Sequence, residues 1–138
     1  MEGQQTYSEL TAAEQAWLTE LTTRGRAMGA TPDDPRSIGG LFDGAVAAVE
    51  SGSQPPEIGN DVVNLVAAVL GEHLRSAGGF EWRIVTDELG SDLCLHNPGT
   101  SYTLFPQSSV AKRWEQRERN WVVPFCDWAL SMAARDPE

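Results

Sequence analysis

Cys94 and His96 are the two residues of this 138-residue chain whose types and spacing come closest to a catalytic pair. A thiol beside an imidazole can act as a nucleophile with its general base. Residues two apart on a strand point to the same face, but their Cβ atoms lie about 7 Å apart, too far for an ordinary direct hydrogen bond. We therefore interpret both as residues of a half-exposed sheet face. The alternative is a small thiol- or carboxylate-dependent hydrolase centred on Cys94, His96 and Asp87.

Three carboxylates, Asp87, Glu88 and Asp92, surround a predicted turn. Grouped carboxylates can hold a cation or transfer protons. Acidic residues are also common in exposed turns, and we favour that structural interpretation. The histidines and cysteines lack the C-x-x-C and H-E-x-x-H spacings of zinc sites, and no Gly-rich phosphate loop follows a predicted strand. The sequence therefore predicts no catalytic set, no metal site and no cofactor.

Aromatic and basic residues near the C-terminus indicate a different chemistry, that of binding. Tryptophan is enriched at binding hot spots; we expect most of the five Trp residues to lie in the core and Trp121 to stay partly exposed. A basic cluster of Lys112, Arg113, Arg117 and Arg119 is diluted by two glutamates. We favour a solvated helix face with internal ion pairs, and a docking patch for an acidic partner, or for the chain's own acidic half, is the alternative. The candidate interaction residues are Trp121, Trp114, Arg113, Arg117, Asp87, Cys94 and His96.

Composition restricts the class of protein. A content of 41% hydrophobic and 22% charged residues is typical of a globular domain that folds without metals or disulfides. The net charge of −10 argues against affinity for nucleic acids or anionic lipids. With two cysteines, no secretory signal and no long apolar run, we expect a cytoplasmic protein. Its expected partner is another protein or a second copy of the chain.

Helical periodicity surrounds a stretch with the period of a β-strand. Thr11, Ser37 and Asn60 are predicted N-caps of three helices. Two more helices are expected over 108–119 and 121–134, because Pro124 would break one continuous helix, and Asn120 is the expected N-cap of the second. Alternating residues between 80 and 106 predict three strands joined by turns at 87–90 and 97–100. The second turn has Pro and Gly where a type II turn requires them.

These elements predict an α+β fold: a three-stranded antiparallel β-meander with amphipathic helices packed on one face, plus an N-terminal helix. We expect residues 1–37 to form the N-terminal helix and its loop. Residues 38–138 are expected to form a single α+β domain.

About residues 38–134 resemble the bacterial family named Domain of Unknown Function 3806. The motifs that carry the resemblance are Leu70-Gly71-Glu72, a hairpin with Glu81-Trp82, Thr86-Asp87 and Gly90, and a helix start with Pro106, Ser108 and Lys112-Arg113. The resemblance supports the limits of the domain and implies no activity. We interpret the motif positions as structural: Trp82 in the core, Gly90 with a positive φ, and Ser108 or Ser109 as a helix cap.

The sequence leads to one functional hypothesis. The chain has no convergent catalytic set, but it has a surplus of aromatic residues and of acidic surface. We therefore expect a non-catalytic binding or accessory protein with an acidic surface.

Overall fold

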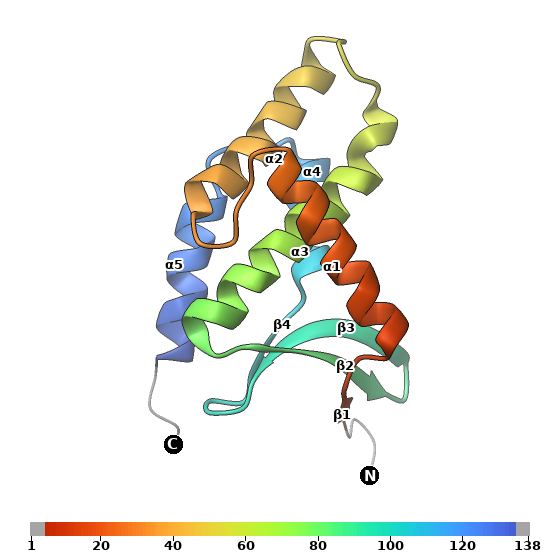
Figure 1. The fold of residues 1–138 in the computed structure, drawn as a ribbon, viewed down its shortest axis with the longest axis vertical. Helices are drawn as coiled ribbons and strands as arrows, with labels where there is room; N and C mark the ends of the chain where they lie inside the picture. Colours follow the sequence, from red (N-terminus) through yellow and green to blue (C-terminus); the bar gives the residue numbers. More distant parts are fainter. Residues whose placement is uncertain (1–4, 135–138) are drawn as a thin grey trace.

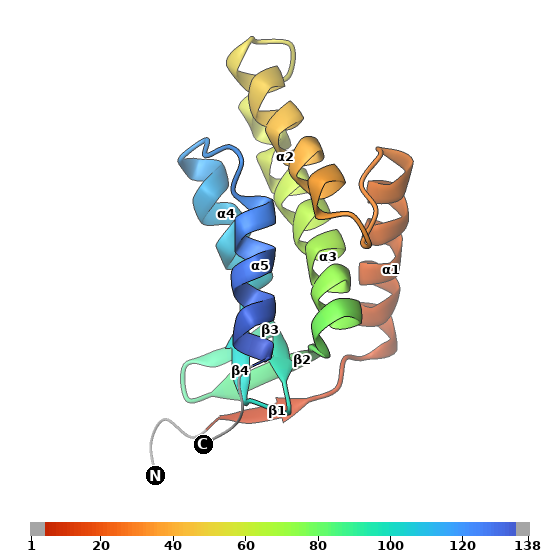
Figure 2. The same cartoon turned by 90° about the vertical axis from the view of Figure 1, so that its left-hand side faces the viewer.

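Five α-helices lie on one side of a four-stranded antiparallel sheet in the computed structural model, which describes residues 5–134 (Figures 1 and 2). The strands are β1 (Thr6–Ser8), β2 (Glu81–Asp87), β3 (Gly90–Asn97) and β4 (Tyr102–Leu104). The helices are α1 (Ala12–Ala27), α2 (Pro35–Glu50), α3 (Gly59–Gly78), α4 (Pro106–Glu115) and α5 (Val122–Ala133), with a short 3-10 helix, η1 (Pro56–Ile58), before α3. The predicted α+β class is confirmed.

The sheet has one strand more than predicted. Its order is β1-β2-β3-β4, and the meander of β2, β3 and β4 is present as expected. The added strand β1 pairs with β2, where Tyr7 lies opposite Val85. All three residues of β1 are exposed, so its sequence has no alternation of buried and exposed positions. The pairing depends on backbone hydrogen bonds to a distant strand, which local periodicity does not reveal.

The predicted capping box of α1 is confirmed: the Thr11 hydroxyl accepts the Glu14 N–H at 3.1 Å, and the Glu14 carboxylate accepts the Thr11 N–H at 2.8 Å. The predicted cap of α2 was wrong, since α2 begins after Asp34, with proline at its first position. The fixed φ of proline suits that position, and the Ser37 hydroxyl instead donates to the Asp34 carbonyl. The predicted cap of α3 was also wrong, because η1 leads directly into the helix one residue before Asn60.

The two C-terminal helices are separate, as predicted, and Pro124 lies in the first turn of α5. Their expected side-chain caps are absent. The N-cap of α4 is Phe105, followed by a proline at the first helical position, so neither Ser108 nor Ser109 caps it. The N-cap of α5 is Trp121 in place of Asn120, which adopts a left-handed conformation just before the helix.

One of the two hairpin turns differs from its prediction. Gly90 has the expected positive φ, 135°. In the second turn the left-handed residue is Ser101 (φ 63°) and not Gly99, so the turn is not type II. The side-chain oxygen of Asn97 accepts a hydrogen bond from the Thr100 N–H at 3.1 Å, and the backbone carbonyl of Asn97 accepts one from the Ser101 N–H at 2.7 Å. These two bonds close a wider turn than the dipeptide signal predicts.

Helix α3 forms the centre of the core, with α1 on one side and α4 and α5 on the other (Figure 2), while α2 packs against both α3 and α5. Close approach depends on glycine. A Cβ at Gly25 of α1 would clash with Val69 of α3, and one at Gly59 would clash with Trp114 of α4. Helix α1 packs on α3 and strand β1 pairs with β2, so elements on the two sides of residue 37 contact each other. The expected domain boundary between residues 37 and 38 stays a prediction.

Candidate functional site

The basic and aromatic candidates Arg113 and Trp121 meet in a groove of about 520 Å³ between α4 and α5. The other side chains that line it come from β4, both helices and the loop between them: Leu104, Ser109, Glu118, Asn120, Pro124, Phe125 and Trp128. We call this feature the α4–α5 groove. Of the other interaction candidates, Trp114 lies in α4 and Arg117 in the loop after it, whereas Asp87, Cys94 and His96 lie on the sheet.

The Arg113 guanidinium lies over two neighbouring aromatic rings. Its guanidinium carbon lies 5.0 Å from the ring centroid of Trp121 and 5.3 Å from that of Phe125. Nη1 donates to the Ser109 carbonyl at 3.0 Å. Within residues 5–134 this is the one hydrogen bond of the side chain, and none of the ion pairs there includes Arg113. Nε is buried without a partner, so most of the donor capacity of this guanidinium is unused.

The aromatic wall of the groove continues along α5. Trp121, Phe125 and Trp128 follow each other at i, i+4 and i+7 and therefore share one helix face. Neighbouring rings lie 5.6 and 5.7 Å apart between centroids. Trp128 is 45% exposed, which places a large apolar side chain at the mouth of the groove.

The expectation that Trp121 stays partly exposed was wrong. Trp121 is only 4% exposed, because its ring packs edge-on against Phe42 of α2, with centroids 5.3 Å apart. Trp114 packs against the same phenylalanine from α4 and is also buried. The exposed tryptophans of the described chain are Trp17 (39%) and Trp128.

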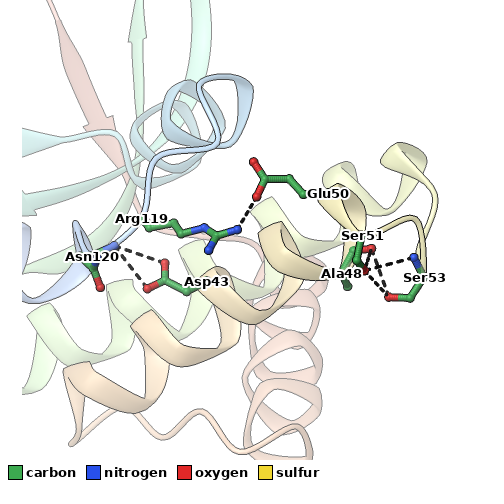
Figure 3. A network of polar contacts seen from close by, with 7 residues as sticks. All are labelled: Asp43, Ala48, Glu50, Ser51, Ser53, Arg119 and Asn120. Carbon is green, nitrogen blue, oxygen red and sulfur yellow. Dashed lines mark hydrogen bonds and ion pairs between the residues drawn. The ribbon is translucent and has the colours of Figure 1, made fainter.

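The loop between α4 and α5 is strained and firmly anchored. Arg117 (φ 52°) and Asn120 (φ 62°) both adopt the left-handed conformation, which is uncommon for residues other than glycine. Helix α2 holds this loop through two contacts: Glu50 pairs with Arg119, and the Asp43 carboxylate accepts the Asn120 N–H (Figure 3). Strain of this kind persists only where the surroundings enforce it, and it is frequent at functional sites.

The predicted internal ion pairs of the basic cluster do not form among residues 5–134. Arg119 pairs across the fold with Glu50 of α2, and Arg117 stacks on Trp114 at 4.8 Å and donates to its carbonyl at 2.6 Å. Arg119 thus contacts the acidic part of the chain, whereas Arg113 faces the groove.

Cys94 and His96 lie on the sheet face that the helices leave uncovered. Leu95, between them, is opposite Trp82, which packs on α3, so its two neighbours point the other way. The prediction that both share one face is confirmed. The expectation that Cys94 is half-exposed was wrong, since it is fully buried. Tyr7 of β1 crosses this face, stacks on His96 with centroids 4.1 Å apart and bonds the Thr103 hydroxyl at 2.9 Å.

The structure does not assemble the three residues of the hydrolase alternative into a catalytic set. Burial raises the pKa of Cys94 to about 11, and nearby Asp92 contributes to the shift, so the thiol is protonated at neutral pH. Nδ1 of His96 is hydrogen-bonded to Thr103 at 3.1 Å. Asp87 lies opposite Gly90, four residues along the sheet from the level of Cys94, or about 13 Å away. Its carboxylate accepts the Leu89 N–H in the turn at 2.8 Å.

Other reactive groups are similarly dispersed. In the part of the chain that the structure describes, no three His, Cys, Asp or Glu residues lie where they could hold a metal ion. His73 bonds the Pro32 carbonyl at 2.7 Å, and burial raises the pKa of Cys126 to about 12. No helix within residues 5–134 has both the length and the apolar character needed to cross a bilayer.

Fold and groove together define a small α+β domain with an aromatic groove that contains an arginine. The chain belongs to the DUF3806 family, a domain of unknown function, whose family model matches residues 43–125. The matched range begins within α2 and ends in the first turn of α5, so it includes Arg113, Trp121 and Phe125 but not Trp128. Searches of the curated proteins and of the solved structures found no match.

Proposed function

We propose that this protein is a non-catalytic binding protein that recognises a protein partner through the α4–α5 groove. The observation that carries the proposal is the aromatic wall of that groove, where Phe125 is partly exposed and Trp128 is 45% exposed beside the buried ring of Trp121. Aromatic side chains that are held rigidly and left accessible are the usual anchors of protein interfaces.

The groove is also organised in advance of binding. Trp121 is wedged against Phe42, and α2 anchors the loop that precedes it. Binding to a site that is already ordered loses less conformational entropy than binding to a mobile one. A rigid scaffold of this kind supports recognition without any chemical step.

Charge supports a protein partner over a nucleic acid or a membrane. Five basic residues stand against fifteen acidic ones over residues 1–109, whereas residues 110–138 carry five of each and are neutral. A strongly acidic chain repels polyanionic surfaces over most of its area. The two free thiols favour a reducing compartment, and we propose the cytoplasm as the place of action.

Site-specific photo-crosslinking tests the proposal. A photoreactive phenylalanine analogue replaces Trp128 in the groove or, as the matched control, Trp17, a similarly exposed tryptophan of α1 that does not line the groove. In cells that produce the protein, we expect a discrete protein adduct from position 128 and none from position 17. Equal adducts at both positions, or none at either, would contradict binding through the groove.

A further inference from the structure

We propose that the α4–α5 groove takes a peptide segment of a partner in which the side-chain carboxylate of one Asp or Glu lies beside a bulky apolar side chain. This inference rests on the proposed function and names the chemistry of the partner. Two features of the groove carry it: the guanidinium of Arg113, which has no carboxylate partner among residues 5–134, and the apolar surface next to it.

The Arg113 guanidinium has N–H donors that are available to a ligand acceptor. Its charge has no carboxylate partner among the described residues, and one donor bond to Ser109 leaves the other N–H groups free of protein acceptors there. The rings of Trp121 and Phe125 displace water from this cation, which strengthens a hydrogen bond to a charged acceptor. A planar carboxylate is the protein group that matches a guanidinium in shape and charge.

A ligand with a single negative charge is the appropriate complement of this groove. Glu118 also lines the groove and is exposed. Its negative charge repels any anion in the groove, so a run of acidic residues or a doubly charged phosphate would meet more repulsion than a single carboxylate, which Arg113 attracts. The groove therefore selects for one acidic residue and not for general acidity.

The remaining lining defines the neighbour of that acidic residue. Trp128, Phe125 and Pro124 form apolar surface on the α5 side, and Leu104 of β4 contributes at the base. A volume of about 520 Å³ accommodates a few side chains and not a whole domain. The segment that satisfies both parts of the groove has a large aliphatic or aromatic side chain next to its carboxylate.

Selection from a phage-displayed library of random peptides, followed by affinity measurements on the enriched peptides, tests the inference with the intact protein. We expect enriched sequences that combine one Asp or Glu with an adjacent bulky apolar residue. Arg113→Gln should weaken their binding about tenfold or more, because it removes the charged donor. Lys112→Gln is the matched control, since it removes the same charge from an exposed position of α4 that does not line the groove.

A second variant distinguishes ligand contact from loss of structure. Glu118→Gln should strengthen binding a few-fold, because it removes the charge that opposes the carboxylate. Damage to the fold would weaken binding in every variant and could not produce these opposite signs. If Arg113→Gln fails to fold, Trp128→Ala tests the apolar part of the groove, with a loss of about tenfold expected.

Several results would overturn the inference. The first is enrichment of peptides without a side-chain carboxylate, or only of peptides that bind through their terminal carboxylate or are polyacidic. The others are undiminished peptide binding by Arg113→Gln and the absence of any enriched peptide. The crosslinking experiment judges the proposed function separately. A groove-specific adduct together with any of these results would leave protein binding intact and reject this ligand chemistry.

Discussion

Gly71 of α3 lies directly against the indole ring of Trp82 of β2, and no Cβ would fit between them. The contact joins the central helix to the sheet at a point where both residues are buried. Two of the motifs that carry the family resemblance, Leu70-Gly71-Glu72 and Glu81-Trp82, meet at this contact. Their structural interpretation is therefore supported, since the glycine makes room for the tryptophan.

Substitution of Gly71 by Ala is expected to destabilise the fold by about 1–3 kcal/mol, because the new methyl group would force Trp82 and the helix apart. Gly44→Ala is the matched control, since Gly44 is inside α2 and has open space around its Cβ position. At position 44 the higher helix propensity of alanine should raise the free energy of unfolding by up to about 1 kcal/mol. Urea unfolding of both variants measures the effect, and equal free energies of unfolding would refute the packing argument.

The left-handed conformation of Asn120 predicts opposite effects for two substitutions. Asn120→Gly should keep or slightly raise stability, because glycine adopts φ 62° freely. Asn120→Val should lower it by roughly 1–2 kcal/mol, since a β-branched residue is strained there. Both variants retain the backbone N–H that Asp43 accepts. Thermal unfolding compares them, and a more stable valine variant would contradict the assigned backbone.

Tyr7 is expected to protect the Cys94 thiol. Cys94 is fully buried on the sheet face that no helix covers, and Tyr7 crosses that face from β1 to Thr103 on β4. We expect Tyr7→Ala to raise the rate of Cys94 alkylation several-fold, because the edge strand then opens more often. Tyr7→Phe keeps the stacked ring on His96 and should have a much smaller effect.

Mass spectrometry of the alkylated protein follows both thiols in the same sample. Cys126 lies in α5, away from β1, and is the internal control. An equal rise at both cysteines would indicate global unfolding instead of local opening of β1.

Alkaline pH is expected to destabilise the fold through the two buried thiols. Burial raises the pKa of Cys94 to about 11 and that of Cys126 to about 12. As the pH rises above the ordinary thiol pKa, the unfolded chain loses these protons before the folded one. Below the ordinary thiol pKa, each thiol makes its full contribution to the free energy of unfolding. Above it, that contribution falls by up to about 1.4 kcal/mol per pH unit, and it is lost as the pH passes the pKa of the thiol in the folded protein.

Urea unfolding between about pH 8 and about pH 10.5 measures this loss. The double variant Cys94→Ala, Cys126→Ala should lose stability less steeply over the same range, although it starts from a lower value because of the cavities it creates. Equal slopes for the two proteins would show that other groups control the alkaline transition.

Part of the candidate site could be predicted from sequence. Arg113 and Trp121 were recognised from charge and residue type, and both line the groove. Phe125 and Trp128 were missed as site residues, although their spacing from Trp121 places them on one helix face. The aromatic periodicity was present, but it does not distinguish a face that packs inward from one that remains partly open.

The features that could be predicted from residue types alone are local ones. Four such features depend only on a residue and its near neighbours in the chain. They are the capping box at Thr11, the break before Pro124, the positive φ of Gly90 and the alternation along β2 and β3. Interactions of this range leave a signature in residue type and spacing, which is why the α+β class and the meander were predictable.

Tertiary structure alone decided which side chains are covered. The pairing of β1 with β2, the burial of Trp121 behind Phe42 and the burial of Cys94 all join segments far apart in sequence; Tyr7 and Thr103, for example, are 96 residues apart. The side chain of Arg113 became the cation of a groove because α2 holds the loop before α5 in place. Burial depends on the neighbours that folding supplies, and no local pattern of residues specifies those neighbours.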